Sequence, residues 1–124
     1  MATQVIFNRE KLKRLIHYVA YRCIERPQKL GAVKLNKVLW YSDLEAYVSS
    51  GTPITGDKYI KKPRGPVSSS LMPVVAELED ERKMAVRHLD EDGRIDYLAL
   101  TKPDVSIFTS EEIRIVEDAI ELAR

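Results

Sequence analysis

Residues 34–67 read KLNKVLWYSDLEAYVSSGTPITGDKYIKKPRGPV, and this stretch decides the fold. Its first half places apolar residues on nearly every side of a helix, which is typical of a helix surrounded by other elements. Its second half is a long loop punctuated by Pro and Gly, and ordered loops of this kind often carry function. The stretch predicts a central helix over residues 32–49 and a motif loop over residues 52–67.

Individual residues of this stretch predict where its helix ends and where its loop turns. Gly51 is well placed to close the central helix as its C-terminal cap. Within the motif loop, Asp57 can accept backbone N–H bonds in a turn, and residues 58–61 can form a short strand. The expected buried anchors of the loop are Ile54, Tyr59 and Ile60.

The residues before the central helix predict a first, amphipathic helix. Asn8 is a suitable N-cap, and Pro27 is expected to end the helix at about Arg26. Between them, apolar residues recur at helical spacing and form one stripe. They are Leu12, Leu15, Ile16, Val19, Ala20, Cys23 and Ile24. The single stripe indicates a helix that packs one face against the core.

A third helix is predicted over residues 69–82. The serines at 68–70 offer N-caps, and Pro73 lies in the first turn, where its missing donor costs little. The apolar face consists of Val74, Val75 and Leu78. The opposite side carries Glu77, Glu79, Asp80 and Glu81. We interpret this acidic side as a solvated face that also offers an alternative docking surface.

Residues 84–89 and 94–100 predict two antiparallel strands, because Asp90-Glu91-Asp92-Gly93 between them is a hairpin signal. With the helices they predict a mainly helical α+β fold. In it, three to four helices surround the central helix and a small antiparallel hairpin packs at the edge. The length of 124 residues indicates a single domain over residues 1–124, large enough to bury a core without disulfides or metals.

The last helix has a strong start signal. Thr109 and Glu112 have the spacing of a capping box, and Phe108 and Ile113 have the spacing of a hydrophobic staple. The predicted core stripe is Ile113, Val116, Ala119, Ile120 and Ala123.

Composition excludes several classes of protein. A single cysteine rules out an internal disulfide framework and fits a reducing compartment. The first residues lack the pattern of a signal peptide, and no window is apolar enough to span a membrane, so we predict a cytoplasmic protein without a membrane partner. With 20 basic and 19 acidic residues, the net charge of +1 does not favour nucleic acid as a partner.

No set of residues has the spacing of a catalytic or metal site, so we predict neither an enzyme nor a metal or cofactor. His17 and His88 are isolated, and we interpret each as a surface or hydrogen-bonded histidine. Cys23 lies on the apolar stripe of the first helix, which is typical of a buried structural thiol. The serines at 68–70 lack the pattern of a nucleophile elbow, and helix capping explains them more simply.

Positive charge is concentrated in the motif loop. The candidate partner-binding residues are Lys58, Lys61, Lys62 and Arg64, with Tyr59 between them. Three interpretations stay open at this point. The cations can be a solvated loop, they can contact an acidic protein partner, for which Tyr and Arg are favoured anchors, or they can contact the phosphates of nucleic acid.

The same stretch resembles the Panacea domain, the domain of SocA-like antitoxins that also occurs in phage-associated proteins. The resemblance rests on residues 34–43, on the pattern G-x-P-I-T-G-D-x-Y over residues 51–59, and on Gly65-Pro66-Val67. It implies that the matching residues hold the loop in one shape for a partner. The residues that we assign this structural role are Lys34, Lys37, Tyr41, Asp43, Gly51, Pro53, Gly56, Asp57, Gly65 and Pro66.

The resemblance implies an antitoxin that neutralises a cognate toxin by direct protein contact. It also implies an adaptor role, in which the antitoxin delivers the toxin to an ATP-dependent protease. Two features depart from the family pattern. Trp40 and Ser42 stand where a Tyr or Phe and a small residue such as Ala are expected, and the chain ends at Arg124, where family members usually continue. The second departure implies a trimmed domain or a final helix whose last turns fray.

Two functions of other classes remain as alternatives. A nucleic-acid-binding regulator would use the four cations of the motif loop, and its binding would weaken steeply with salt. A small hydrolase would use His17, His88 or a pair of carboxylates. It would require a concave pocket in which two titratable groups of shifted pKa converge.

Overall fold

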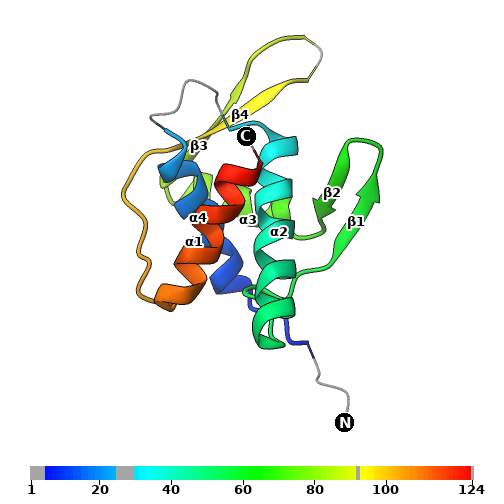
Figure 1. Cartoon of the computed structure of the whole chain (residues 1–124). Helices are drawn as coiled ribbons and strands as arrows, with labels where there is room; N and C mark the ends of the chain where they lie inside the picture. Colours follow the sequence, from blue (N-terminus) through cyan, green and yellow to red (C-terminus); the bar gives the residue numbers. More distant parts are fainter. Residues whose placement is uncertain (1–4, 25–29, 92, 124) are drawn as a thin grey trace.

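The computed structural model describes residues 5–24, 30–91 and 93–123. In this part of the chain, four helices and two antiparallel two-stranded sheets form a mainly helical α+β fold, which confirms the predicted class (Figure 1). The helices are α1 (Arg9–Arg22), α2 (Ala32–Ser50), α3 (Leu71–Asp80) and α4 (Ser110–Leu122). The strands are β1 (Tyr59–Lys62), β2 (Gly65–Ser68), β3 (Met84–His88) and β4 (Ile95–Ala99). None of the described helices combines the length and apolarity needed to cross a membrane.

α1 begins where the sequence predicts, because the side chain of Asn8 accepts a 3.0 Å hydrogen bond from a backbone N–H of the first turn. It ends at Arg22 and not at Arg26, and the predicted effect of Pro27 lies outside the described residues. After the helix the chain closes a tighter turn, which leaves the side chain of Ile24 49% exposed. The rest of the predicted stripe is buried in the core.

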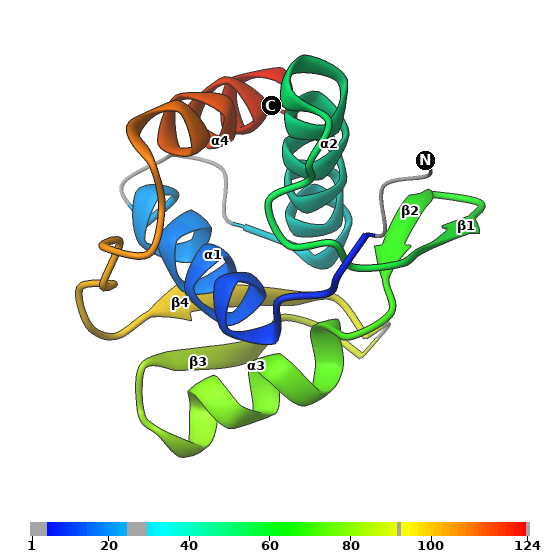
Figure 2. The same cartoon turned by 90° about the horizontal axis from the view of Figure 1, so that it is seen from below.

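α2 is the central helix, as predicted, and other elements pack on several of its sides, but its outer face is not covered as the apolar pattern had indicated. α4 packs on one side of it and β2 on the other, while α3 packs on α1 and β3 instead (Figure 2). The buried apolar residues of the inner face are Leu35, Val38, Leu39 and Ala46. The outer face remains in solvent, where the side chains of Leu44, Tyr47 and Val48 are 42%, 51% and 71% exposed.

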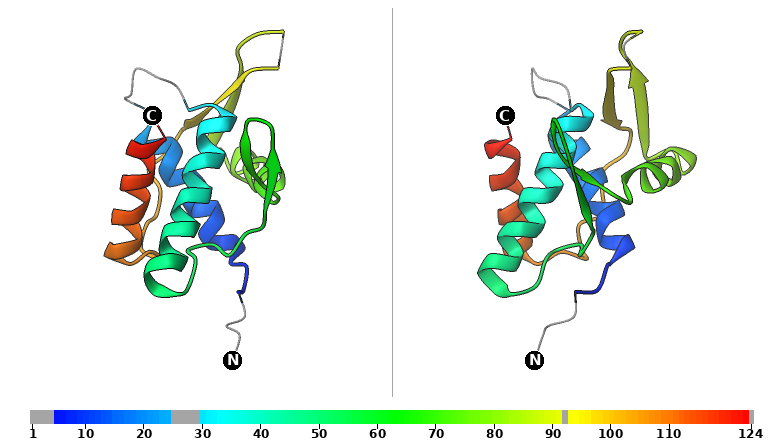
Figure 3. Two further views of the ribbon diagram at one scale, coloured as in Figure 1. Left: turned by 45° about the vertical axis from the view of Figure 1, so that its right-hand side comes forward. Right: turned by 90° about the vertical axis from the view of Figure 1, so that its right-hand side faces the viewer.

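The predicted C-terminal hairpin is present as β3 and β4, with Val86 opposite Tyr97. The backbone N–H of Tyr97 also donates to the carbonyl of Leu30 at 2.9 Å, which joins the hairpin to the chain just before α2. Asp96 is 1% exposed, and Arg87 satisfies its carboxylate with two hydrogen bonds of 3.0 and 2.7 Å. Figure 3 shows that the β3–β4 hairpin extends past the N-terminal end of α2.

A second hairpin, which the sequence analysis did not predict, occupies the motif loop. β1 corresponds to the short strand expected over residues 58–61, and it pairs antiparallel with β2. The register places Tyr59 opposite Ser68 and Lys61 opposite Pro66. β2 escaped prediction because it begins with Gly and Pro, two residues that are depleted in strands.

α3 buries the predicted apolar face, and its acidic side is only partly a solvated face. Glu77 and Glu81 both accept hydrogen bonds from the Nζ of Lys13 on α1, at 2.8 and 2.6 Å. Burial lowers the pKa of Lys13, but the hydrogen bonds and charges of the two glutamates outweigh it and raise that pKa above its ordinary value. Two of the four carboxylates therefore attach α3 to α1 and are less available to a partner.

α4 begins with the predicted capping box. The hydroxyl of Thr109 accepts the backbone N–H of Glu112 at 3.0 Å, and the Glu112 carboxylate accepts the backbone N–H of Thr109 at 2.9 Å. Phe108 is buried and Ile113 is half-buried against the core. The fully buried residues of the helix are Ile115, Val116, Ala119 and Ile120, so Ile115 joins the predicted stripe and Ile113 moves to its edge.

His17 is hydrogen-bonded, one of the two outcomes that the sequence analysis predicted, and it is buried and not on the surface. Its side chain is 5% exposed, and its Nε2 lies 2.9 Å from the carbonyl oxygen of Thr101, so the ring donates from this nitrogen. Burial lowers the pKa of His17 below its ordinary value of 6.5. Cys23 is buried as expected, and His88 is exposed on β3.

The lowered pKa of His17 predicts a loss of stability on mild acidification. Below pH 6.5 the unfolded chain binds a proton at this ring before the folded chain does, so the free energy of unfolding falls as the pH drops. We expect His17→Gln to reduce this dependence between about pH 7 and pH 5, because the amide can still donate to Thr101 but does not titrate. Urea denaturation across this range measures it, and the exposed His88→Gln variant is the control. Equal slopes for His17→Gln and the wild type would contradict the assignment.

Candidate partner-binding surface

The motif loop is attached to α2 through the carboxylate of Asp43. Its Oδ1 accepts the backbone N–H of Thr55, and its Oδ2 accepts the hydroxyls of Thr55 and Tyr59, each at 2.6 Å. Asp43 is 5% exposed, and these three donors satisfy a charge that would otherwise be costly to bury. The network therefore holds residues 55–59 in one position against the helix.

Tyr59 was predicted to bind a partner together with the four cations of the motif loop, but its hydroxyl points inward to Asp43. Burial, and then the charge and the hydrogen bond of Asp43, raise the pKa of Tyr59 far above its ordinary value, so its hydroxyl stays a donor. Since neighbouring residues of a strand point to opposite faces, the inward Tyr59 turns Ile60 outward. Ile60 is 49% exposed, and the prediction that it is a buried anchor is wrong, whereas Ile54 is buried as expected.

A second carboxylate, Asp57, organises the chain between the hairpin and α3. As predicted, it accepts a backbone N–H, that of Lys58 at 2.9 Å. It also accepts the hydroxyls of Ser69 and Ser70, at 3.2 and 3.1 Å, and that of Ser68. The prediction that these serines cap α3 is wrong, because Ser70 at the N-cap position makes no side-chain cap bond. Their hydroxyls satisfy Asp57 instead.

Gly56 lets the segment before α1 cross the motif loop at close range. Its φ is +73°, and a Cβ at this position would lie 3.0 Å from the carbonyl carbon of Ile6 and 3.2 Å from the Cα of Phe7. Beside it, the backbone N–H of Asn8 donates to the carbonyl of Thr55 at 2.7 Å. The loop is therefore held between α2 and the chain that leads into α1.

Asn36, to which the sequence analysis gave no role, holds β2 on α2. Its Oδ1 accepts the backbone N–H of Ser68 at 2.8 Å, and its Nδ2 donates to the carbonyl of Ala32 at 2.9 Å. Asn36 is 4% exposed. One signal was available in the sequence: Asn36 lies two helical turns before Asp43, so both polar side chains lie on the flank of the helix that faces the loop.

Two other residues of the structural motif, Gly51 and Gly65, have contacts that fix the ends of α2 and of the hairpin turn. Gly51 ends α2 in the left-handed conformation, with its N–H donating to the carbonyl of Tyr47 at 2.8 Å. A Cβ on Gly65 would lie 3.5 Å from the Cε of Lys37, so the lysine stem passes close to the hairpin. The half-buried members of the motif are Lys34, Lys37, Tyr41, Pro53, Gly56, Asp57, Gly65 and Pro66.

The four cations of the motif loop are all in solvent, on the β1–β2 hairpin or directly before it. Lys58, Lys61, Lys62 and Arg64 are all exposed. The ion pairs among the described residues use cations of α1, of α4 and of residues 83–94, and none includes these four. Lys34 and Lys37 of α2 likewise have no described ion pair. Although the net charge of the whole chain is near zero, the hairpin and the adjoining part of α2 therefore carry an excess of positive charge.

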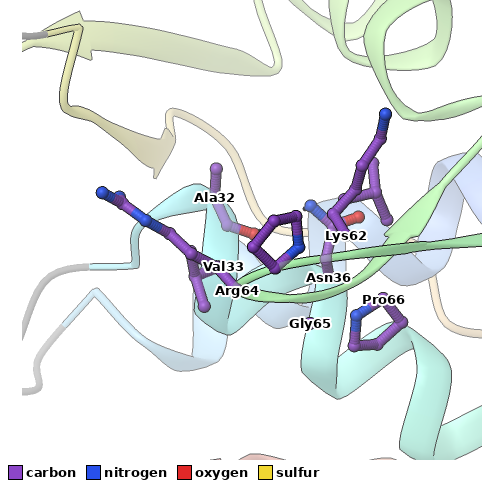
Figure 4. Close-up of a pocket in the computed structure, with 9 residues that line it drawn as sticks. Ala32, Val33, Asn36, Lys62, Arg64, Gly65 and Pro66 are labelled. Carbon is purple, nitrogen blue, oxygen red and sulfur yellow. Dashed lines mark hydrogen bonds between the residues drawn. The ribbon is translucent and has the colours of Figure 1, made fainter.

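A groove of about 350 Å³ lies between the turn of this hairpin and the first turns of α2 (Figure 4). Val33, Pro66 and Val67 give it an apolar lining, and Lys62 and Arg64 extend from it in different directions. Within the described residues, no histidine, cysteine or carboxylate lines this groove. It therefore lacks the convergent titratable pair that the hydrolase alternative requires.

The two histidines lie on different elements, and neither lines the groove. His17 bonds the carbonyl of Thr101 from α1, and His88 lies on the exposed end of β3. No group of three or more His, Cys, Asp or Glu that could hold a metal ion occurs in the described ranges.

The geometry is that of a small α+β domain in which a buried polar network fixes a surface hairpin. The family model of the SocA-like antitoxin, Panacea domain, matches residues 35–124, which include most of α2, both hairpins, α3 and α4. The chain therefore belongs to this family of antitoxin domains. No curated protein and no solved structure matches the chain.

The Asp43 network predicts a large effect of a nearly isosteric substitution. Asp43→Asn replaces one acceptor oxygen by an NH₂ group that faces donors of the loop, so we expect a loss of about 2–4 kcal/mol in the free energy of unfolding. Glu45→Gln, an exposed change on the same helix, is expected to cost less than about 0.5 kcal/mol. Urea denaturation of both variants measures the difference, and similar costs would show that Asp43 does not carry the loop.

Substitutions of Gly51 and Gly56 distinguish the energetic cost of a left-handed backbone conformation from the cost of a close contact. Gly51 and Gly56 have similar positive φ angles of +83° and +73°, but only Gly56 lies against other backbone atoms. Gly51→Ala is expected to cost about 1–2 kcal/mol, the price of the left-handed conformation. Gly56→Ala is expected to cost about 1–3 kcal/mol more, since its methyl group overpacks the crossing with Ile6. Equal costs in thermal or urea unfolding would contradict the close crossing.

Proposed function

We propose that this chain neutralises a cognate protein toxin by direct binding, and that the β1–β2 hairpin forms part of the contact. Membership of the SocA-like antitoxin family supports the role. The observation that carries the choice of surface is the group of four exposed cations without a described ion-pair partner on one hairpin. They favour a toxin surface with carboxylates.

The polar network supports this proposal because it lowers the cost of binding. A flexible loop would lose conformational freedom on contact, and each ordered side chain or residue would weaken the complex. Here Asp43 and Asp57 hold the loop, and Asn36 holds β2. The cations are therefore presented from a backbone that is already ordered before the partner arrives.

The family resemblance also suggests an adaptor role toward an ATP-dependent protease. That role needs a further contact with the protease, and none of the described features favours it over direct neutralisation. The two mechanisms differ in one measurable respect. An adaptor lowers the amount of toxin in a protease-dependent way, whereas direct neutralisation leaves the toxin present and bound.

Co-expression with the protein encoded beside this chain tests the proposal. We expect the neighbour to stop growth alone, to be harmless with this chain, and to co-purify with it. We expect Lys61→Glu/Arg64→Glu to weaken the complex by about tenfold or more and to restore toxicity, because two positive charges become negative opposite an acidic surface. Growth curves, affinity purification and toxin immunoblots provide the readouts.

The matched control is Arg94→Glu/Lys102→Glu, which changes the net charge equally at exposed positions outside the β1–β2 hairpin. Neutralisation should survive this control. Persistent toxicity with folded wild-type chain present would overturn the antitoxin proposal for this chain. Equal loss in both double variants would show that total charge, and not the hairpin, decides the binding.

A further inference from the structure

The outer face of α2 is apolar along most of its length. Val33, Trp40, Leu44, Tyr47 and Val48 recur at helical spacing on the side opposite the buried residues of the helix. We call these five residues the outer stripe. Four of them are between 40% and 71% exposed, and Trp40 is half-buried. In the left view of Figure 3, no described helix or strand passes in front of this helix.

Exposed apolar residues are common singly, but a stripe along one helix face is a mark of an interaction site. No residue of this stripe belongs to the hydrophobic core, which lies on the other face of α2. The aromatic side chains Trp40 and Tyr47 also belong to the types that are enriched at the centres of protein interfaces. The outer stripe therefore has the composition of an interface core.

The outer stripe is continuous with the groove beside the hairpin, because Val33 belongs to both. The apolar side chains of Pro63, Pro66 and Val67 extend the surface from the first turn of α2 onto the hairpin turn. Lys62 and Arg64 stand at this end (Figure 4), and the stem of Lys37 lies between the stripe and the hairpin. One surface thus combines an apolar centre with a cationic edge.

The charges of this surface select the kind of occupant. The described cations around it have no ion-pair partner, whereas the nearby carboxylates of Asp43 and Asp57 are occupied by loop donors. A second copy of the chain would bring two cationic edges toward one another, which is unfavourable. Phosphates of a nucleic acid would gain nothing from Leu44 or Val48. A protein segment with apolar side chains flanked by Asp or Glu matches both parts.

We propose that the outer stripe of α2, the groove and the cationic hairpin together form one docking surface for a toxin segment that has an apolar centre and acidic flanks. This inference rests on the proposed antitoxin function and adds to it the apolar half of the contact. The segment lies along α2 and ends against the hairpin turn. The stripe supplies most of the affinity, and the cations orient the segment.

The test removes the apolar half without touching the charges. Leu44→Gln/Val48→Gln replaces two exposed apolar side chains by a good helix former, so the fold and the urea midpoint stay unchanged. We expect this variant to bind the neighbour-encoded protein about 10- to 100-fold more weakly and to lose neutralisation in cells. Met72→Gln/Leu100→Gln is the matched control, because these two residues are 82% and 56% exposed and lie outside the surface. The control is expected to bind like the wild type.

Isothermal calorimetry with the purified neighbour separates failure of the inference from failure of the proposed function. If the wild type neither binds nor neutralises the neighbour, the proposed function fails and the inference falls with it. If the wild type binds and Leu44→Gln/Val48→Gln binds equally well, the antitoxin role stands and the apolar docking surface is overturned.

Two further measurements cover the other occupants. Light scattering of the wild-type chain alone reports self-association; a dimer that Leu44→Gln/Val48→Gln converts to a monomer would overturn the inference in favour of a second copy. Binding of a DNA duplex that weakens steeply with salt, without binding of the neighbour, would overturn it in favour of nucleic acid. A monomeric wild type that binds the neighbour and does not bind the duplex is the expected result.

Discussion

The carboxylate of Asp43 is the constraint on which the binding side of this domain depends. It is buried on the flank of α2, and a buried charge is tolerated only when donors surround it. All three of its donors come from the motif loop. Burial of Asp43 therefore requires the loop to pack against the helix. Asp57 and Asn36 continue this arrangement, and the hairpin, its cations and the adjoining groove take their positions from it.

The two faces of α2 explain how so small a domain can offer a surface as well as a core. The inner face contributes side chains that are almost fully buried, and these form the core together with residues of α1, α3, α4 and the β3–β4 hairpin. The outer face is also apolar, but no other helix or strand packs on it in the described structure. α3, which could have covered it, packs on α1 and β3. Charge is divided in a similar way. Most cations elsewhere pair with carboxylates, whereas those of the hairpin remain available.

Features with a local physical cause were predictable. The capping box of Thr109 and Glu112, the N-cap of Asn8 and the left-handed cap of Gly51 each depend on a few neighbouring residues, and each was found as expected. Predictions that required a distant partner were less successful. The serines at 68–70 carry the signal of a helix cap, but Asp57 competes for their hydroxyls across the loop. β2 starts with Gly and Pro, and only its contact with α2 and β1 makes it a strand.

The sequence by itself determined the class of fold, the four helices, the caps that start α1 and α4, most of the buried stripes of α1, α3 and α4, and the resemblance to the family, because periodicity, caps and motifs each depend on short stretches of chain. It also located the cationic cluster of the candidate site. The tertiary structure alone decided which side of α2 is covered, that Tyr59 turns inward to Asp43, and that the hairpin cations have no described ion-pair partners. These outcomes depend on which segments meet in space, and residues equally apolar or charged in the sequence become core or surface only when those contacts are made.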